Sequence, residues 1–257
     1  MNINEEKRSQ WQALKGMGFK AHWDYFWDYY KVHVLVAVIG IAFVVMLIKD
    51  IANNLPFAIN AIFINANSMQ TTEALEAEFA EHEGIDTKEA DVSIDVTTTL
   101  SLTAYDSMNV TTGQKIYAMI AANDLDLMMA DSEVFENYAK NEVFEDLRNY
   151  LSEDELSSLG DKVFYVDQVQ IDKLREEKDS ATLDDVVAEE TAPAEYVFER
   201  KDPSEMEQPV PVGIIMEGNK TLTDLECYYG TTPIAGIVTG TQRGETAADL
   251  IRFLLNK

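Results

Sequence analysis

The sequence contains few of the residues on which most enzyme sites depend. It has one cysteine, Cys227, and three histidines among 257 residues. A single cysteine excludes an intramolecular disulfide, a CxxC redox pair and a multi-cysteine zinc site. His22 and His33 lie in or beside an N-terminal apolar segment, and His82 stands between two glutamates. For His82, a solvated side chain is therefore favoured over a catalytic base. We expect no catalytic residue, no metal site, no cofactor and no enzyme activity.

Several sequence motifs of nucleotide-binding proteins and hydrolases are also missing. The chain contains no GxxxxGK[ST], GxGxxG or GxSxG motif. Asp124, Asp126 and Asp131 bracket a predicted strand and are candidate calcium ligands, although no EF-hand spacing supports that interpretation. An exported hydrolase that uses two carboxylates remains an alternative, because only three-dimensional distances can test it.

Basic residues are scarce relative to acidic ones. The chain has 20 Lys and Arg against 46 Asp and Glu, for a net charge of −26. Residues 1–49 hold six basic and four acidic residues, so residues 50–257 carry a net charge of −28. Such a domain repels nucleic acid, and we expect no nucleic-acid partner. Its acidity predicts either attraction of cationic ligands or divalent metal, or a solvated surface that keeps an exported domain soluble.

A long apolar run occurs once, over residues 32–48. These 17 residues cover about 25 Å as a helix, the lower end of what spans a bilayer core. Lys31 and Lys49 close the two ends and can reach lipid phosphates. Before the run stand aromatic residues of the types that settle at the headgroup level: Trp23, Tyr25, Phe26, Trp27, Tyr29 and Tyr30. The sequence predicts a transmembrane helix in the lipid bilayer, with a buried helix of a soluble core as the alternative.

Lys and Arg near this run predict its orientation, because cytoplasmic flanks carry the excess of basic residues. The N-terminal flank holds Lys7, Arg8, Lys15, Lys20 and Lys31. We therefore predict a single-pass cell-membrane protein with a cytoplasmic tail (1–31), a transmembrane helix (32–48), a linker (49–56) and an extracytoplasmic domain (57–257). A cleaved signal peptide is the alternative, but the long acidic-containing leader and the absence of a prompt small-x-small site favour an uncleaved signal anchor.

The outer domain alternates strand and helix patterns, which indicates an α/β fold with a mainly parallel sheet. Strands are predicted at 57–65, 91–100, 125–130, 163–166, 211–216 and 233–238. Helices are predicted at 73–82, 111–122, 133–141, 153–159, 221–229 and 245–255. Thr72 and Thr221 are the predicted caps of two of them, and Ser152 and Glu155 form a predicted capping box at the start of another. Residues 171–208 are rich in charge and poor in apolar residues, and we predict a mobile acidic excursion with a helix at 171–178.

Residues 112–147 carry a resemblance to a known family. The helix TGQKIYAMIAAND leads into LDLMMAD, in which Asp126 precedes three apolar residues, and then into the phrase Phe144-Glu-Asp-Leu147. This order is similar to the middle of the extracellular solute-binding proteins of ABC transporters in Gram-positive bacteria. The C-terminal GIVTGTQRGETAADLIRFLLNK also resembles their closing segment. The resemblance implies a two-lobed, periplasmic-binding-protein-like fold of type II, a small-molecule solute and a membrane permease as partner.

Ligands of open α/β sheets bind beyond the carboxyl ends of the strands and at helix N-termini. The polar residues predicted at these places are Asn65, Ser68, Thr71, Thr72, Asp131 and Ser132. We expect a non-catalytic, membrane-anchored solute-binding-like protein linked to ABC-type uptake. The alternative is a structural or regulatory interaction domain that binds no ligand. An aromatic pocket between two lobes favours the first function, and a filled cleft favours the second.

Overall fold

The computed structural model describes residues 18–53, 55–104, 106–180 and 196–256. The chain divides into two compact units, residues 1–55 and 56–257, which are described separately. The first seventeen residues of the predicted tail, one residue of the predicted linker and the centre of the predicted acidic excursion (181–195) lie outside the described residues.

The described part of the first unit is one long helix, α2, at Phe19–Asn53. It contains the apolar run, so the prediction of a helix over 32–48 is confirmed. Its segment Tyr30–Lys49 has 20 residues and is long and apolar enough to cross a membrane, and none of it is buried.

The second unit is a three-layer α/β domain around one six-stranded sheet with the order β2-β1-β3-β6-β5-β4. Its strands are β1 (Phe57–Ile64), β2 (Asp91–Asp95), β3 (Leu127–Asp131), β4 (Val163–Asp167), β5 (Pro209–Ile215) and β6 (Pro233–Ile237). Its α-helices are α3 (Glu73–Glu83), α4 (Ser107–Ala121), α5 (Ser132–Ala139), α6 (Glu153–Leu159), α7 (Gln168–Ser180), α9 (Lys220–Asp224) and α10 (Gly244–Asn256). Short 3-10 turns lie at Leu147–Asn149, Gly160–Lys162 and Pro203–Glu205.

The sheet is mixed, which corrects the prediction of a mainly parallel one. β1 runs parallel to β2 and β3, whereas β6 is antiparallel to β3 and β5, and β4 is antiparallel to β5. A parallel crossover needs a connection of about a dozen or more residues, which is usually a helix that returns the chain along the strand. α9 has five residues and covers only about 8 Å, so β6 returns antiparallel beside β5. Alternation of strands and helices does not reveal this difference.

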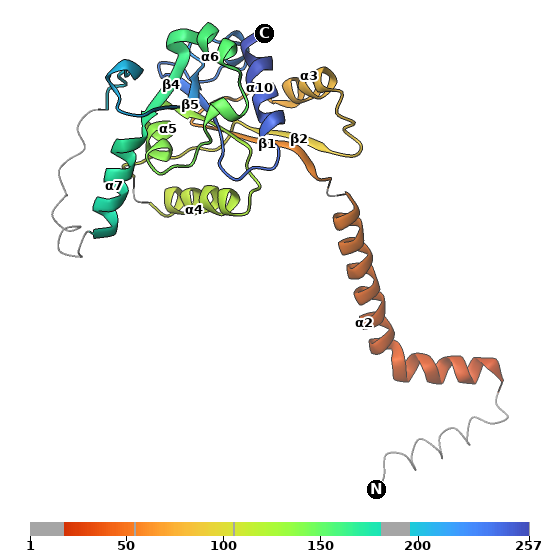
Figure 1. The fold of residues 1–257 in the computed structure, drawn as a ribbon. Coiled ribbons are helices and arrows are strands. Elements are labelled where there is room, and N and C mark those ends of the chain that lie inside the picture. Colours follow the sequence, from red (N-terminus) through yellow and green to blue (C-terminus); the bar gives the residue numbers. More distant parts are fainter. Residues whose placement is uncertain (1–17, 54, 105, 181–195, 257) are drawn as a thin grey trace. The chain divides into compact units, whose positions relative to one another are not determined.

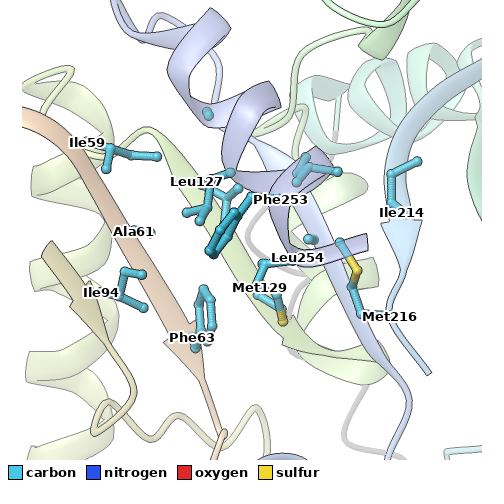
Figure 2. Close-up of a cluster of buried hydrophobic side chains, with 14 of the residues drawn as sticks. Ile59, Ala61, Phe63, Ile94, Leu127, Met129, Ile214, Met216, Phe253 and Leu254 are labelled. Carbon is cyan, nitrogen blue, oxygen red and sulfur yellow. The ribbon is translucent and has the colours of Figure 1, made fainter. Parts of the chain in front are cut away.

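Two apolar clusters fill the spaces on either side of the sheet. One joins Ile59, Ala61 and Phe63 of β1 to α3, α6 and α10, and Figure 2 shows its side chains from β1, β3 and α10. The other joins Ile62 and Ile64 of β1 to α4 and α5. Successive β1 residues thus face opposite layers, as the twofold period of a strand requires. Figure 1 shows α3, α6 and α10 on one face of the sheet and α4 and α5 on the other.

Several helix boundaries differ from the predicted ones because other residues provide the caps. α4 begins at Ser107, where the Asp106 carboxylate accepts hydrogen bonds from two backbone N–H groups, and not at Thr111 or Thr112. α9 is capped by Asn219, whereas a cap from Thr221 was predicted. The predicted capping box of Ser152 and Glu155 is present at α6.

β2 and α7 also differ in length from their predictions. β2 ends at Asp95 instead of residue 100, because the Asp95 carboxylate accepts hydrogen bonds from the backbone N–H of Thr97 and the hydroxyls of Thr97 and Thr98. These bonds form a local turn that competes with the strand ladder. α7 begins at Gln168, three residues before the predicted start, and follows β4 without a break.

Candidate functional site

The carboxyl ends of the neighbouring parallel strands β1 and β3 bring two of the predicted site residues together. Asn65 donates from Nδ2 to Oδ2 of Asp131 over 2.6 Å. The Asn65 backbone is left-handed, with a φ of 60°, which asparagine tolerates better than most residues. Its side-chain amide also pairs with the backbone of Leu100 in both directions, at 2.8 Å each. Asn65 is thus occupied by contacts within the protein.

The Asp131 and Ser132 pair begins α5, as predicted. Oδ1 of Asp131 accepts a hydrogen bond from the backbone N–H of Val134 over 3.1 Å, and both Asp131 and Ser132 are buried. The phenol of Tyr196 lies against Ser132 and Glu136, and burial raises the pKa of Tyr196 to about 12. A tyrosine from within the predicted acidic excursion (171–208) therefore covers the start of α5.

The other three predicted residues lie in the loop between β1 and α3 and do not converge on a pocket. The Ser68 hydroxyl donates to the carbonyl of Leu225 over 2.5 Å. Thr72 occupies the N-cap position of α3, but its hydroxyl donates to Glu76 and caps no backbone N–H. Thr71 is exposed. The predicted cap by Thr72 is therefore wrong, and Ser68 serves to hold two loops together.

The loop after α9, residues 225–230, fills the carboxyl end of β1. The backbone N–H of Tyr228 donates to the carbonyl of Ala66 over 3.0 Å, and its phenol donates to the carbonyl of Met129 over 3.2 Å. Burial holds the pKa of Tyr228 well above its usual value and also raises the pKa of the neighbouring Cys227 thiol. Tyr228 has a φ of 58°, an uncommon conformation for an aromatic residue that the surrounding contacts enforce. No signal in the sequence indicated this filling.

A second polar cluster lies just before the amino end of β3, around the fully buried Asp126. Oδ2 of Asp126 accepts hydrogen bonds from the backbone N–H of Asn60 over 2.7 Å and from Nε of Arg243 over 2.8 Å. Oδ1 accepts the hydroxyl of Thr241. Nη2 of Arg243 is buried and has no hydrogen-bond partner among the residues that the structure describes. The cluster ties the start of α10 to the sheet.

Sequence reasoning missed Thr241 and Arg243 as partners of Asp126. The available signal was the lone basic residue in the phrase TGTQRGET between a strand and a helix. The calcium alternative is also contradicted. Asp126 directly precedes β3 and Asp131 is its last residue, so strand geometry places them about 16 Å apart. Within the described ranges, no group of three or more His, Cys, Asp or Glu side chains is placed to hold a metal ion.

A cavity of about 410 Å³ lies beside the edge strand β4, away from the predicted site residues. Its lining comes from Gly160, Asp161, Val163–Tyr165, Arg200–Pro203 and Ile215. The guanidinium of Arg200 pairs with Asp161 at 3.1 Å and with Glu217 at 2.6 Å. Lys201 lines both this cavity and a neighbouring hollow of about 60 Å³ against α5 and α7. The cavity therefore offers two cationic side chains in a strongly acidic chain.

No protein-family model, curated protein or solved structure matches the chain. The resemblance to solute-binding proteins therefore stays a prediction. That resemblance implied two lobes with a ligand cleft between them. The described part of residues 56–257 instead forms one compact unit around a single sheet.

Proposed function

We propose that the chain is a membrane-anchored protein in which α2 crosses the lipid bilayer as an uncleaved signal anchor. The observation that carries this proposal is the 20-residue segment Tyr30–Lys49, of which none is buried. Apolar side chains exposed along a whole helix are unfavourable in water, at about 25 cal/mol for each Å². Transfer into lipid removes that penalty. The Lys and Arg residues before the span orient the tail toward the cytoplasm and the α/β domain toward the outside.

The α/β domain functions in this proposal as a non-catalytic interaction domain for a partner protein at the membrane surface. Its support is the filled carboxyl end of the sheet, where Asn65, Asp131 and Tyr228 use their polar groups on one another and on the backbone. A ligand would have to displace these contacts to occupy the position that open α/β sheets ordinarily use. The outer surface is then the part of the domain that meets its partner.

Solute binding is the second candidate function, and the cavity beside β4 favours it. Its volume of about 410 Å³ lies within the range of small-molecule sites. Arg200 and Lys201 supply positive charge for an anionic solute, while Tyr165 supplies an aromatic surface. The ion pairs of Arg200 involve exposed carboxylates, and such pairs contribute little, so a bound anion can replace them. A membrane permease would be the partner in this case.

Membrane topology is tested by labelling single cysteines in intact cells with a membrane-impermeant maleimide. Thr71→Cys places a thiol at an exposed position of the α/β domain, and Ser9→Cys places one in the tail. We expect labelling of Thr71→Cys in intact cells and of Ser9→Cys only after lysis. The unmodified chain is the control, because its one thiol, Cys227, is buried. Release of the chain by alkaline carbonate would contradict the anchor, and the reverse labelling pattern would contradict the orientation.

The two candidate functions are separated by thermal melting of the full chain in detergent against a panel of carboxylates, phosphates, amino acids and sugars. A solute at 100 times its dissociation constant stabilises the folded state by about 2.7 kcal/mol. If the cavity binds it, Lys201→Ala abolishes the shift and Lys88→Ala, an exposed lysine before β2, preserves it. A flat panel on folded protein favours the interaction domain, whose partner is then sought by cross-linking in membranes.

A further inference from the structure

The N-terminal turns of α2 extend beyond the length that a bilayer requires. α2 has 35 residues and is about 52 Å long, whereas its apolar segment Tyr30–Lys49 alone covers about 30 Å. The helical turns at residues 19–29, called here the aromatic arm, therefore lie outside the span. Figure 1 shows α2 bent, with the red N-terminal turns running at an angle to the turns that follow.

One line of the aromatic arm and of the adjoining turn consists of aromatic side chains. Phe19, Trp23, Phe26, Trp27 and Tyr30 are spaced by 4, 3, 1 and 3 residues, which places them on one side of a helix. The ring centroids of Phe19 and Trp23, and of Trp23 and Trp27, are 6.3 Å apart, and those of Phe26 and Tyr30 are 5.4 Å apart. All five side chains are exposed, from 42% for Phe26 to 83% for Phe19.

Charged residues occupy a second line of the same turns. Positions 20, 24, 28 and 31 are Lys, Asp, Asp and Lys, spaced by 4, 4 and 3 residues. At 100° per residue this line is centred about 110° around the helix from the aromatic line. The turns are therefore amphipathic, and the two Lys and two Asp give them no net charge.

We propose that the aromatic arm lies in the plane of the membrane, with its aromatic line in the headgroup region of a phospholipid surface. This inference rests on the proposed function, because it requires Tyr30–Lys49 to be inserted. Tryptophan and tyrosine rings combine a large apolar body with a polar atom and therefore favour the membrane–water boundary. The arm is continuous with the span through Tyr30, so lipid is the first surface that its rings meet.

The chemistry of the two lines specifies the kind of lipid surface. Interfacial helices that bind by charge are rich in Lys and Arg and depend on anionic lipid. The arm and the adjoining turn together have two Lys and two Asp, so the attachment of the arm depends on apolar contact with the boundary between headgroups and acyl chains. A zwitterionic surface of phosphatidylcholine is sufficient, and added anionic lipid or salt has little effect.

Tryptophan fluorescence tests the position of the arm directly. The Trp11→Phe variant of the full chain leaves Trp23 and Trp27 as its tryptophans. We place it as single copies in phosphatidylcholine nanodiscs that contain lipids brominated near the glycerol or near the chain end. The expected result is blue-shifted emission, stronger quenching by the shallow bromines than by the deep ones, and no change when anionic lipid is added.

Three other results would overturn the proposal. Quenching by aqueous iodide without quenching by brominated lipid would show that the arm lies in water. Stronger quenching by the deep bromines than by the shallow ones would show that the arm is part of the transmembrane span. Red-shifted emission in single-copy discs that turns blue only when two copies share a disc shows that a second chain covers the rings. A failed anchor is recognised separately, because the chain then no longer floats with phosphatidylcholine vesicles.

A pair of matched variants isolates the aromatic line. Phe19→Ser with Phe26→Ser should raise iodide access to the tryptophans and reduce shallow quenching, with flotation unchanged. Asp24→Asn with Asp28→Asn alters the charged line and should leave the shallow quenching in place. Equal effects of the two pairs would contradict an aromatic contact with lipid.

Discussion

A carboxylate is buried at each end of β3, but different groups compensate its charge. Asp126, just before the strand, is fully buried and pairs with the guanidinium of Arg243. Asp131, at the end of the strand, is 9% exposed and receives hydrogen bonds from the amide of Asn65 and the backbone N–H of Val134. An ionised carboxylate without water needs compensation from nearby donors or charge. The deeper of the two has a cation, and the one nearer to solvent has neutral donors.

The two carboxylates also differ in how far along the sequence their partners lie. Arg243 is 117 residues from Asp126, and Asn65 is 66 residues from Asp131. The first pair joins the C-terminal helix to the sheet, and the second joins two strands that are already neighbours. Loss of a partner should therefore matter more for Asp126. Three substitutions test this ranking in the full chain in detergent. Unfolding is measured by urea denaturation.

Removal of the cation should have the largest effect. Arg243→Met keeps much of the side-chain volume but leaves the Asp126 carboxylate buried without a counter-charge. Loss of one partner of a buried ion pair typically destabilises by 3–5 kcal/mol, and the partial exposure of Arg243 places the expected loss near the lower end, at about 3 kcal/mol. The urea midpoint measures this loss. The double variant Asp126→Asn with Arg243→Met should lose less than the two single losses combined, and strict additivity would show that the pair is not coupled.

Removal of the carboxylate at the other end should have an intermediate effect. Asp131→Ala removes the cap of α5 and one acceptor of the Asn65 amide, which together should destabilise by about 2 kcal/mol. Asp131→Asn keeps a capping oxygen and is the matched control, with an expected loss below about 1 kcal/mol. A larger loss for Asp131→Ala than for Arg243→Met would reverse the ranking of the two ends.

A surface carboxylate with a cation should have the smallest effect, and its effect should depend on pH. Arg252 and Ser152 hold the pKa of Glu155 down to about 2, from an ordinary value of 4.5. A carboxyl group with a lowered pKa stabilises the folded state above its ordinary pKa and loses that contribution as the pH falls toward about 2. Glu155→Gln should therefore lower the urea midpoint slightly at pH 6 and by less at pH 3. Glu153→Gln, which removes a carboxylate earlier in the same helix and leaves the contacts of Glu155 with Arg252 and Ser152 in place, is the control. An equal loss for Glu155→Gln at the two pH values would contradict the prediction.

Local sequence patterns predicted most helices and strands of the fold. They did not predict features that depend on contacts between distant parts of the chain. The capping box of Ser152 and Glu155 predicted α6 because both partners lie within four residues. Every predicted strand of the outer domain has a counterpart near its predicted place, and the end of β2 was missed because the Asp95 turn competes with pairing. Strand direction depends on how each connection crosses the sheet. The sequence predicted a longer helix at 221–229, and only the structure shows that α9 has five residues.

The candidate site shows the same limit. The rule that strand ends meet at one edge of a parallel sheet correctly brought Asn65 and Asp131 together. It did not reveal that residues 225–228 would fill the space beside them, because that loop enters from an unrelated part of the chain. Asp126 stood out in the sequence as an acid before an apolar strand, but its pairing with Arg243 required the return of β6 beside β3.

The place where the sheet joins the linker has a mechanical consequence. Pro56 leads directly into β1, an interior strand with a parallel neighbour on each side. Tension passed through the linker reaches the domain at the first residue of that strand. A lengthwise pull on β1 loads its hydrogen bonds to β2 and β3 together, in shear, because both ladders run along the direction of pulling. The antiparallel half of the sheet, β6-β5-β4, is not pulled directly.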